Sequence, residues 1–553
     1  MIYSQKELAQ LVVEYSLAYQ IKHVIISPGS RNAPLIIGFT NQPRIRTYSV
    51  VDERCAAFVG LGIAQQLQQP TVLVCTSGSA LLNYYPAVAE AFYSTIPLIV
   101  LSADRPKHLI DIGDGQTIRQ ENVFKNHSLY NANLSEGRRY EADNKQQLET
   151  AFKTAIEKHG PVHINVPFDE PLYEITDKLS IKKIAVKEVL TKQVRLTGSL
   201  TKYAAQWNKA TKKMVLIGSH FPNKELQEQL AELAKDPSVL VFTETISNVH
   251  HPVFINNIDQ LIFPLTDKEF EKLQPEILLT LGGMIVSKKI KQFLRTYRPR
   301  EHWHIDAENA PDTYHCLTQH VKTTATLFFE VFLSLVHPLK STYREFGLTL
   351  KKQRKEKHQQ FLAKAVFSDL KVFDIVINHL PGNIQLQLGN SSIIRYSQLF
   401  DIQGSLQVFC NRGTSGIDGS TATAIGAALA VKETTVLITG DISFLYDSNA
   451  LWNNYMRNDF RIILINNGGG GIFRFIPGPS TTNALNYFEA PHRLTAKQLC
   501  EMYHLEYHTA NNERDLKEQL EVFYINKDKP KLLEIFTPTT ANDFVLKEYF
   551  KFL

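Results

Sequence analysis

The stretch from Val436 to Phe473, VLITGDISFLYDSNALWNNYMRNDFRIILINNGGGGIF, decides the fold of the chain. An apolar, strand-like run ends at Gly440-Asp441, a segment with helical potential follows, and a second apolar run ends at Asn466-Asn467 and four glycines. Two strands joined in this way are expected to be parallel, with their carboxyl ends at the same edge of the sheet. Open α/β folds bind their ligands at that edge. The pattern therefore predicts an α/β fold with a carboxylate and an amide at its ligand-binding edge.

These side chains have the chemistry of a magnesium site. Carboxylate oxygens, amide oxygens and exposed glycine backbone are hard ligands suited to Mg²⁺, which usually also takes phosphate oxygens and water. A lone Gly-Asp or Asn-Asn is turn chemistry more often than not. The interval between the two pairs and the glycine run favour a functional interpretation, so the stretch predicts a site for Mg²⁺ and a diphosphate.

Composition limits the class of protein. A chain of 553 residues is too long for one core and predicts about three domains. Its 60 basic and 55 acidic residues are too nearly balanced to indicate a nucleic-acid partner. Lys6, Glu7 and Glu14 in the first helix-like segment argue against a signal peptide, and no apolar run approaches the ~20 residues that span a bilayer. Five scattered cysteines without a CxxC pair fit a reducing cytosol, so we expect a cytoplasmic enzyme without membrane insertion.

Apolar strand-like runs alternate with helical patterns in three parts of the chain, which indicates βαβ units and parallel sheets. We expect three doubly wound α/β domains with mainly parallel sheets, over residues 1–176, 177–350 and 351–553. The lysine-rich, aperiodic segment from Asp177 to Thr197 predicts a linker. The basic run from Lys351 to His358 is better explained as the exposed face of a linking helix than as a nucleic-acid contact.

The candidate strands are short apolar runs that lie between helical patterns. They are His23–Ser27, Thr47–Val51, Thr71–Cys75, Pro97–Ser102, His163–Val166, Met214–Gly218, Val239–Thr243, Ile277–Leu281, His302–Asp306, Ile384–Leu388, Leu406–Phe409, Val436–Thr439, Arg461–Ile465 and Lys531–Phe536.

Loops after several of these strands carry charged side chains. Glu53 follows the second strand and precedes small and apolar residues, an environment in which desolvation raises the pKa of a carboxyl group. The alternative, which is more frequent for an isolated glutamate, is a charge that stabilises a helix N-terminus. Arginines also recur in such loops, and several together indicate substrates with more than one carboxylate: Arg31, Arg105, Arg119, Arg395 and Arg412.

Seven motifs in order resemble the thiamine-diphosphate-dependent enzymes of the 2-oxoacid decarboxylase and acetohydroxyacid synthase superfamily. Any one motif is weakly specific, but seven in register are highly specific. Within the superfamily the chain is most similar to the menaquinone-pathway synthases, because Ile442 stands where other members have the second glycine of Gly-Asp-Gly. The motifs cover the whole chain: Ser27 to Leu35, Asp52 to Arg54, Thr76 to Pro86, Ser102 to Pro106, Asn411 to Gly419, Gly440 to Asp447 and Asn466 to Phe473.

The resemblance implies a thiamine-diphosphate-binding fold with a pyrimidine-binding domain, a central domain and a diphosphate-binding domain. It implies thiamine diphosphate and Mg²⁺, or alternatively Mn²⁺, as cofactors. It also implies a homodimer or a dimer of dimers, with each active site at an interface between subunits. The expected reaction is decarboxylation of 2-oxoglutarate and addition of the remaining four-carbon fragment to isochorismate. Alternatives are another carboligase or decarboxylase on the same scaffold, or a catalytically silent relative.

The resemblance also implies roles for individual residues. Glu53 is the expected catalytic residue, hydrogen-bonded to the aminopyrimidine ring. The metal ligands are Asp441, the carbonyl of Gly469 and Asn467, with Asn466 as the alternative to Asn467. The remaining positions contact the cofactor or the substrates. The cofactor set is Ser391, Ser415, Ile417, Ile442 and Ser443, and the substrate set is Ser30, Arg31, Arg105, Gln116, Arg395, Arg412, Ile472 and Phe473.

Overall fold

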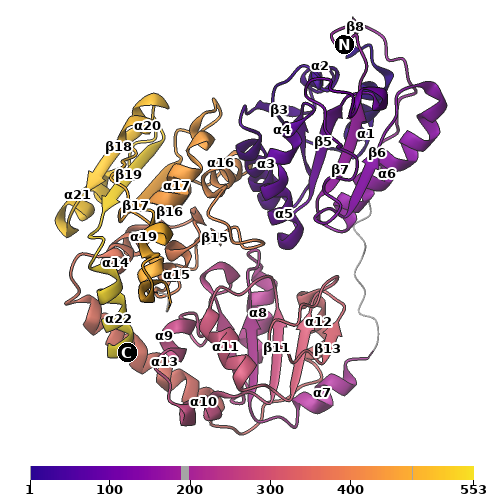
Figure 1. Cartoon of the computed structure of the whole chain (residues 1–553). Helices are drawn as coiled ribbons and strands as arrows, with labels where there is room; N and C mark the ends of the chain where they lie inside the picture. The colour runs from indigo at the N-terminus through magenta and orange to yellow at the C-terminus, as the bar shows by residue number, and fades with distance from the viewer. Residues whose placement is uncertain (1, 188–198, 476–477) are drawn as a thin grey trace.

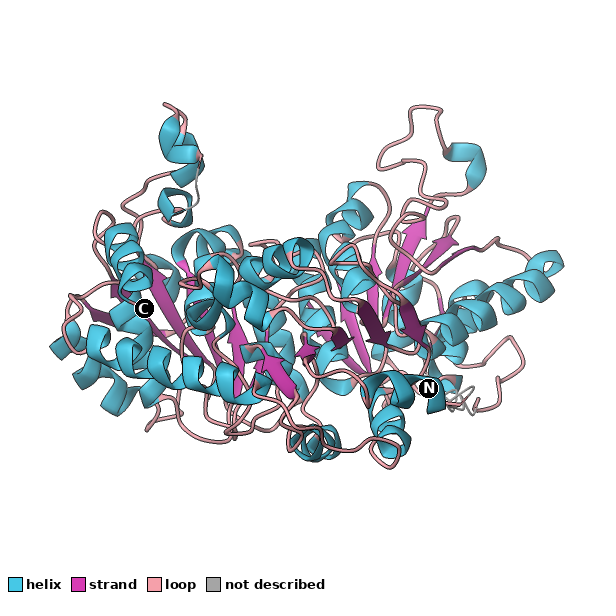
Figure 2. Cartoon of the chain, turned by 90° about the horizontal axis from the view of Figure 1, so that it is seen from below, coloured by secondary structure: helices cyan, strands magenta, loops and turns pink. Residues whose placement is uncertain are grey.

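The computed structural model describes residues 2–187, 199–475 and 478–553. Three sheets form three α/β units, which Figure 1 shows with the first unit beside the third and the central unit below both. Helices cover the strands on both faces (Figure 2). The expected fold class, α/β with mainly parallel sheets, is confirmed, whereas the exact domain boundaries stay predictions. Among the described residues, no helix has both the length and the apolar character to cross a membrane.

The first unit contains a six-stranded, fully parallel sheet in the order β3-β2-β4-β5-β7-β6. Its strands are β2 (His23–Ile26), β3 (Arg46–Ser49), β4 (Thr71–Cys75), β5 (Leu98–Asp104), β6 (Tyr130–Asn133) and β7 (Val162–Pro167). Its helices are α1 (Glu7–Ala18), α2 (Ala33–Thr40), α3 (Glu53–Leu67), α4 (Ser79–Asn83), α5 (Tyr85–Ser94) and α6 (Glu141–Glu157). A short antiparallel pair, β1 (Tyr3–Ser4) and β8 (Ile175–Thr176), closes the unit.

The central unit contains a five-stranded parallel sheet in the order β10-β9-β11-β12-β13. Its strands are β9 (Lys213–Ile217), β10 (Val239–Thr243), β11 (Ile277–Leu281), β12 (Glu301–Ile305) and β13 (Gln319–Val321). Its helices are α7 (Thr201–Trp207), α8 (Lys224–Leu233), α9 (Ile258–Ile262), α10 (Asp267–Leu273), α11 (Lys288–Thr296) and α12 (Ala325–Phe332), and α13 (Tyr343–Leu362) leads into the third unit.

The third unit contains a six-stranded parallel sheet in the order β15-β14-β16-β17-β19-β18. Its strands are β14 (Gln385–Leu388), β15 (Gln407–Phe409), β16 (Thr435–Gly440), β17 (Arg461–Asn466), β18 (Glu506–Ala510) and β19 (Lys531–Phe536). The first and third sheets share one strand order, 2-1-3-4-6-5, when each is numbered from its first strand. The helices are α14 (Asp369–His379), α15 (Ser392–Ser397), α16 (Ser420–Ala430), α17 (Asp441–Tyr446), α18 (Ile472–Phe475), α19 (Leu485–Glu489), α20 (Lys497–Met502), α21 (Glu513–Phe523) and α22 (Asn542–Phe552).

Besides the two-residue strands β1 and β8, three strands of the large sheets, β6, β13 and β18, are absent from the sequence-based expectation. Each lies at the edge of its sheet, where one side of the strand has no neighbour. Their sequences, YNAN, QHV and EYHTA, are correspondingly polar and lack an apolar run. The 14 predicted strands all coincide with strands of the structure, with ends displaced by a few residues at most.

The two basic segments have structural contacts. Lys351 of α13 donates through Nζ to the carbonyl oxygens of Pro252 and Phe254, and Arg354 and Lys357 donate to the carbonyl oxygen of Leu553. The run therefore lies on a linking helix, as predicted, but it is exposed only in part: Lys351, Arg354 and Lys357 are half-buried, and His358 is buried. The described part of the predicted linker contacts α1. The backbone N–H of Lys187 donates to Ala18 O at 2.9 Å. Residues 188–197 of that linker lie outside the described residues.

Helices α3 and α16 occupy equivalent places in the first and third units and pack against each other (Figure 1). Their approach is reciprocal. A Cβ at Gly62 of α3 would lie 2.1 Å from the carbonyl oxygen of Thr423, and a Cβ at Gly426 of α16 would lie 2.0 Å from that of Val59. Glycine at both positions lets the two backbones touch. One buried apolar cluster continues across this contact, from Phe58 and Leu61 to Ile425 and Phe444.

The N-terminus of α3 also contacts the end of α17. Arg54 donates to Tyr446 O at 2.8 Å, and Asn449 donates to a carboxylate oxygen of Asp52 at 2.8 Å. Asp447 is fully buried here, and this burial raises its pKa to about 7 although it accepts the N–H of Ala422. The first turn of α3, which carries Glu53, is thus held by the third unit.

Gly426→Ala is expected to destabilise the chain, since the new Cβ overlaps a carbonyl oxygen of the facing backbone. Overpacking of this kind costs about 1–3 kcal/mol, more than the roughly 1 kcal/mol by which alanine favours a helix over glycine. Chemical denaturation measures the effect. Gly404→Ala is the matched control, because its nearest neighbour would be at an ordinary 3.6 Å. A stability gain for Gly426→Ala would contradict the close packing.

Candidate active site

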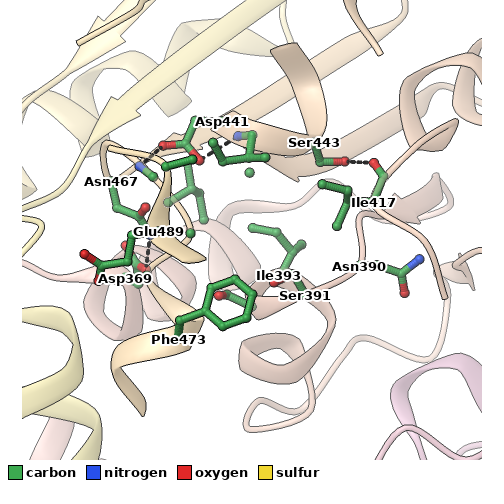
Figure 3. A pocket seen from close by; sticks show the side chains of 18 of the residues that line it. Asp369, Asn390, Ser391, Ile393, Ile417, Asp441, Ser443, Asn467, Phe473 and Glu489 are labelled. Carbon is green, nitrogen blue, oxygen red and sulfur yellow. Dashed lines mark hydrogen bonds between the residues drawn. The ribbon is translucent and has the colours of Figure 1, made fainter. Parts of the chain in front are cut away.

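A cavity of about 220 Å³ lies in the third unit at the carboxyl ends of β14, β16 and β17. Strand β14 pairs with β15 on one side and with β16 on the other, so the chain changes direction across the sheet at this point. Ligands of open α/β sheets bind at such a switch point. The described residues that line the cavity lie between Asp369 and Ala490, all within the third unit (Figure 3).

Asp441 is the first residue of α17 and follows directly after β16. Its Oδ2 accepts the backbone N–H groups of Gly468 at 2.9 Å and Gly469 at 3.0 Å, and Nε2 of His492 lies 3.3 Å from the same oxygen. Burial raises the pKa of the carboxyl group, while the N–H groups and His492 oppose that rise. The side chain is thus held rigidly at the cavity wall with its backbone donors.

Asn467 follows β17 and lines the cavity with Asp441 (Figure 3). Its Nδ2 donates to Oδ2 of Asp369 at 3.0 Å, whereas its Oδ1 is buried and makes no hydrogen bond. Asn466 does not line the cavity, and its Nδ2 donates to Oε1 of Glu534 at 2.7 Å. A buried carbonyl oxygen without a donor is costly, and a cation beside Asp441 would satisfy it.

The cavity residues fit a divalent cation with a diphosphate. A carboxylate, an unpartnered amide oxygen and the backbone of Gly469 converge as hard oxygen ligands. Ser391, Ile417, Ile442 and Ser443 form part of the wall, and Ser443 donates to Ile417 O at 2.5 Å. Ser415 does not line the cavity; its hydroxyl lies 3.5 Å from Arg412 O.

Phe473 closes one side of the cavity by packing on Phe488, with ring centroids 5.3 Å apart (Figure 3). Ile472 is the first residue of α18 and precedes Phe473, but it does not itself line the cavity.

Arg395 and Arg412 lie close enough for their charges to interact. Burial and the neighbouring Arg412 guanidinium lower the pKa of Arg395. Arg412 donates to Oδ1 of Asn390 at 2.7 Å, and the Nε atoms of both arginines are buried without a hydrogen-bond partner. Two half-buried cations whose buried Nε donors are unused favour an anion between them, which agrees with the carboxylate interpretation of these arginines.

The predicted site residues of the first unit do not line this cavity: Ser30, Arg31, Glu53, Arg105 and Gln116. Glu53 is half-buried at the start of α3 and accepts a hydrogen bond from Asn83 at 3.2 Å. Arg31 donates to Phe168 O at 2.8 Å. Burial lowers the pKa of Arg31, and the charge of Arg105 adds to this lowering. Arg105 lies 3.6 Å from Asp114, and Ser30 and Gln116 are exposed. Within one chain, the predicted site residues therefore form two separate groups, one at the cavity of the third unit and one in the first unit.

Sequence reasoning missed two acidic residues of the site. Asp369, at the start of α14, lines the cavity, but an Asp after a Ser at a helix start is ordinary capping chemistry. Glu90 of α5 is buried and accepts the N–H groups of Gly413 and Thr414, each at 2.7 Å. It thereby holds the loop of Arg412 from the first unit. A single glutamate in the apolar segment PAVAEAF was the available signal.

Comparison with known proteins agrees with this geometry. Three family models match consecutive parts of the chain: the N-terminal TPP binding domain of thiamine pyrophosphate enzymes over residues 6–128, the thiamine pyrophosphate middle domain over 186–388, and the C-terminal TPP binding domain over 388–535. The chain is 57% identical to the 2-succinyl-5-enolpyruvyl-6-hydroxy-3-cyclohexene-1-carboxylate synthase of Flavobacterium psychrophilum, over the whole of both chains.

The chain belongs to this synthase family. It is also 54% identical to the Flavobacterium johnsoniae synthase over the whole of both chains. The Porphyromonas gingivalis synthase is 37% identical over all of this chain and 98% of its own length. As a member of the synthase family, the chain is an enzyme that depends on thiamine diphosphate. The superfamily resemblance stated from the motifs is thereby confirmed.

Asp441→Ala is expected to abolish Mg²⁺-dependent binding of thiamine diphosphate, because the diphosphate loses its charge bridge to the protein. Titration calorimetry of the cofactor with and without Mg²⁺ measures this. Asp528→Ala, at an exposed aspartate outside the cavity, is the control and should bind as the wild type does. Equal cofactor affinity in Asp441→Ala and the wild type would rule out the metal site.

Proposed function

We propose that the chain decarboxylates 2-oxoglutarate and adds the remaining four-carbon fragment to isochorismate, with thiamine diphosphate and Mg²⁺ or Mn²⁺. The observation that carries this proposal is the pair of Asp441 and the unpartnered Oδ1 of Asn467 at the switch point of the third sheet. It occurs in a chain that matches a curated synthase from end to end. The product named by that synthase contains a succinyl group and an enolpyruvyl-cyclohexene carboxylate, which supports both substrates.

In this proposal, the third unit holds the cofactor. Asp441, Asn467 and the carbonyl of Gly469 bind the cation. Ser391 and Ser443 of the cavity wall lie by the diphosphate, Ser415 is the third serine proposed there although it does not line the cavity of this chain, and Ile417 and Ile442 shape the cavity around the rings. When bound, thiamine diphosphate supplies the electron sink for decarboxylation.

Glu53 completes the site by exchanging a proton with the aminopyrimidine ring nitrogen. Its position supports an assembly, since Glu53 lies in the first unit and outside the cavity of its own chain. A second copy that brings its first unit to this cavity would join the two groups of residues. We therefore propose a homodimer or a dimer of dimers with active sites at the interface.

The substrates are recognised through their carboxylates, two on each. Arg395 and Arg412 present unused buried donors to them, and Ser30, Arg31, Arg105 and Gln116 come from the partner's first unit in the same assembly. Ile472 and Phe473 form the apolar side of the substrate site. The five cysteines are all unpaired, which supports a cytoplasmic location.

The direct test is turnover of 2-oxoglutarate with isochorismate by the purified full-length chain, with and without thiamine diphosphate and Mg²⁺. Formation of the succinylated product only in the complete mixture is the expected result. Pyruvate in place of 2-oxoglutarate is the control. Equal or better turnover of pyruvate would overturn the substrate assignment and favour another carboligase on this scaffold.

Glu53→Gln is expected to keep the fold but lose turnover by a factor on the order of 10²–10⁴, the usual contribution of a general acid-base group. The amide cannot accept and return the proton. Steady-state kinetics with saturating cofactor measures kcat. Glu141→Gln, at an exposed position paired with Lys145, should leave kcat unchanged. Turnover of Glu53→Gln within a few-fold of the wild type contradicts the assignment.

Arg395→Lys and Arg412→Lys should each lower kcat/KM by about ten- to a hundredfold. Lysine keeps the charge but loses the planar fork, and a hydrogen bond to a charged group contributes roughly 1.5–3 kcal/mol. Kinetics with each substrate varied in turn shows which carboxylate each arginine binds, while cofactor affinity stays near normal. Arg514→Lys, at an exposed arginine paired with Glu518 on α21, is the matched control. Unchanged constants for both substrates would assign these arginines a structural role.

A further inference from the structure

Asp369 lies in the cavity wall next to the proposed metal ligands, yet no role is assigned to it by the motifs. The residue is 3% exposed and begins α14. Figure 3 shows it below Asn467, on the same side of the cavity as Asp441. Among the described residues, hydrogen bonds from Thr537 and Asn467 stabilise its carboxylate and no lysine or arginine is paired with it.

Both carboxylate oxygens of Asp369 have donors. Its Oδ2 accepts Nδ2 of Asn467 at 3.0 Å, and its Oδ1 accepts the hydroxyl of Thr537 at 2.6 Å. The backbone N–H of Asp369 donates to Oδ1 of Asn542 at 2.8 Å, which fixes the residue at the helix start. Asp369 is therefore directed at the amide of Asn467 and acts on the cavity through it.

The Asp369 carboxylate determines which way the amide of Asn467 faces. A carboxylate accepts hydrogen bonds only, so it holds the NH₂ group and would repel the amide oxygen. The opposite rotamer would place two oxygens in contact and leave two N–H donors beside the cation position. In the observed orientation Oδ1 is buried, free of donors and beside Asp441. Thr539 also donates to the backbone carbonyl of Asn467 at 2.6 Å and holds the main chain.

We propose that Asp369 is a positioning residue that orients Asn467 as a metal ligand and adds a second negative charge next to Asp441. This inference rests on the metal site of the proposed function. The second charge favours a divalent over a monovalent cation, because the attraction scales with the charge of the ion. Partners behind a metal ligand usually contribute a factor of about 10–100 in metal affinity.

Asp369→Asn tests the orientation, because its side-chain amide can face Asn467 with either its oxygen or its NH₂ group. Mn²⁺ binding to the full-length chain with thiamine diphosphate, followed by electron paramagnetic resonance, measures metal affinity without turnover. We expect a dissociation constant about 10- to 100-fold higher and a melting temperature near that of the wild type. At saturating metal, kcat should recover, which a merely structural defect would not allow. Asp374→Asn, on the same helix and paired with Lys371, is the control.

The exchanged pair, Asp369→Asn together with Asn467→Asp, provides a rescue. The amide now donates to the carboxylate, which again presents an oxygen to the cation, so metal affinity should return to within a few-fold of the wild type. Unchanged affinity in Asp369→Asn overturns the inference, as does a loss that the exchanged pair fails to rescue. If Asp369→Asn does not fold, Thr537→Val provides the test, because it removes the hydroxyl that donates to Oδ1 of Asp369. Weaker Mn²⁺ binding supports the inference, and unchanged binding overturns it.

Wild-type turnover, measured in parallel, separates the two proposals. Wild-type chain that binds Mn²⁺ with the expected dependence on Asp369 but does not convert 2-oxoglutarate and isochorismate refutes the proposed substrates and leaves the inference standing. Conversely, normal turnover together with metal affinity insensitive to Asp369 refutes the inference alone.

Discussion

The backbone contact between α3 and α16 is the constraint on which the rest of the structure depends. Gly62 and Gly426 each lie where any side chain would meet the opposite helix. Protein interiors are close-packed and hardly compressible, so a shift of one helix at this contact also moves the other. The first turn of α3 holds Glu53, and the turn before α16 holds the loop of Arg412 and Ile417. Their separation is therefore fixed by two glycines that bind no ligand.

Two further contacts cross the same interface, and in both a side chain of the first unit holds the backbone of the third unit. Glu90 accepts the backbone of the loop before α16, and Arg54 contacts the end of α17, the helix that begins at Asp441. The candidate-site residues of the third unit are thus positioned from the first unit, although the contacting residues are hundreds of positions apart in sequence. Since the two sheets share a strand order, the equivalent helices meet face to face and the contact is reciprocal.

The sequence predicted the fold class and every interior strand because a strand covered on both sides needs a continuous apolar run. It also predicted one edge strand of each large sheet, β3, β10 and β15. It failed at β6, β13 and β18, whose open edges permit polar residues such as those of YNAN. At the site, Asp441 and Asn467 were predictable because each follows a buried strand directly. Asp369 and Glu90 were not, since their partners, Asn467 and Gly413, are brought near only by the folded chain. Residues were missed when their contacts are with residues distant in sequence, whatever their chemical importance.

The shared apolar cluster at α3 and α16 has a consequence for how the chain is made. Domains generally fold in order as they leave the ribosome. The first unit can form its sheet early, but one face of α3 must wait until the residues of α16 have been synthesised, after the whole central unit. Throughout that interval the face of α3 that carries Phe58 and Val59 stays uncovered. Nascent chains of this protein are therefore exposed to aggregation at one identifiable surface, and a chaperone that covers α3 would act there first.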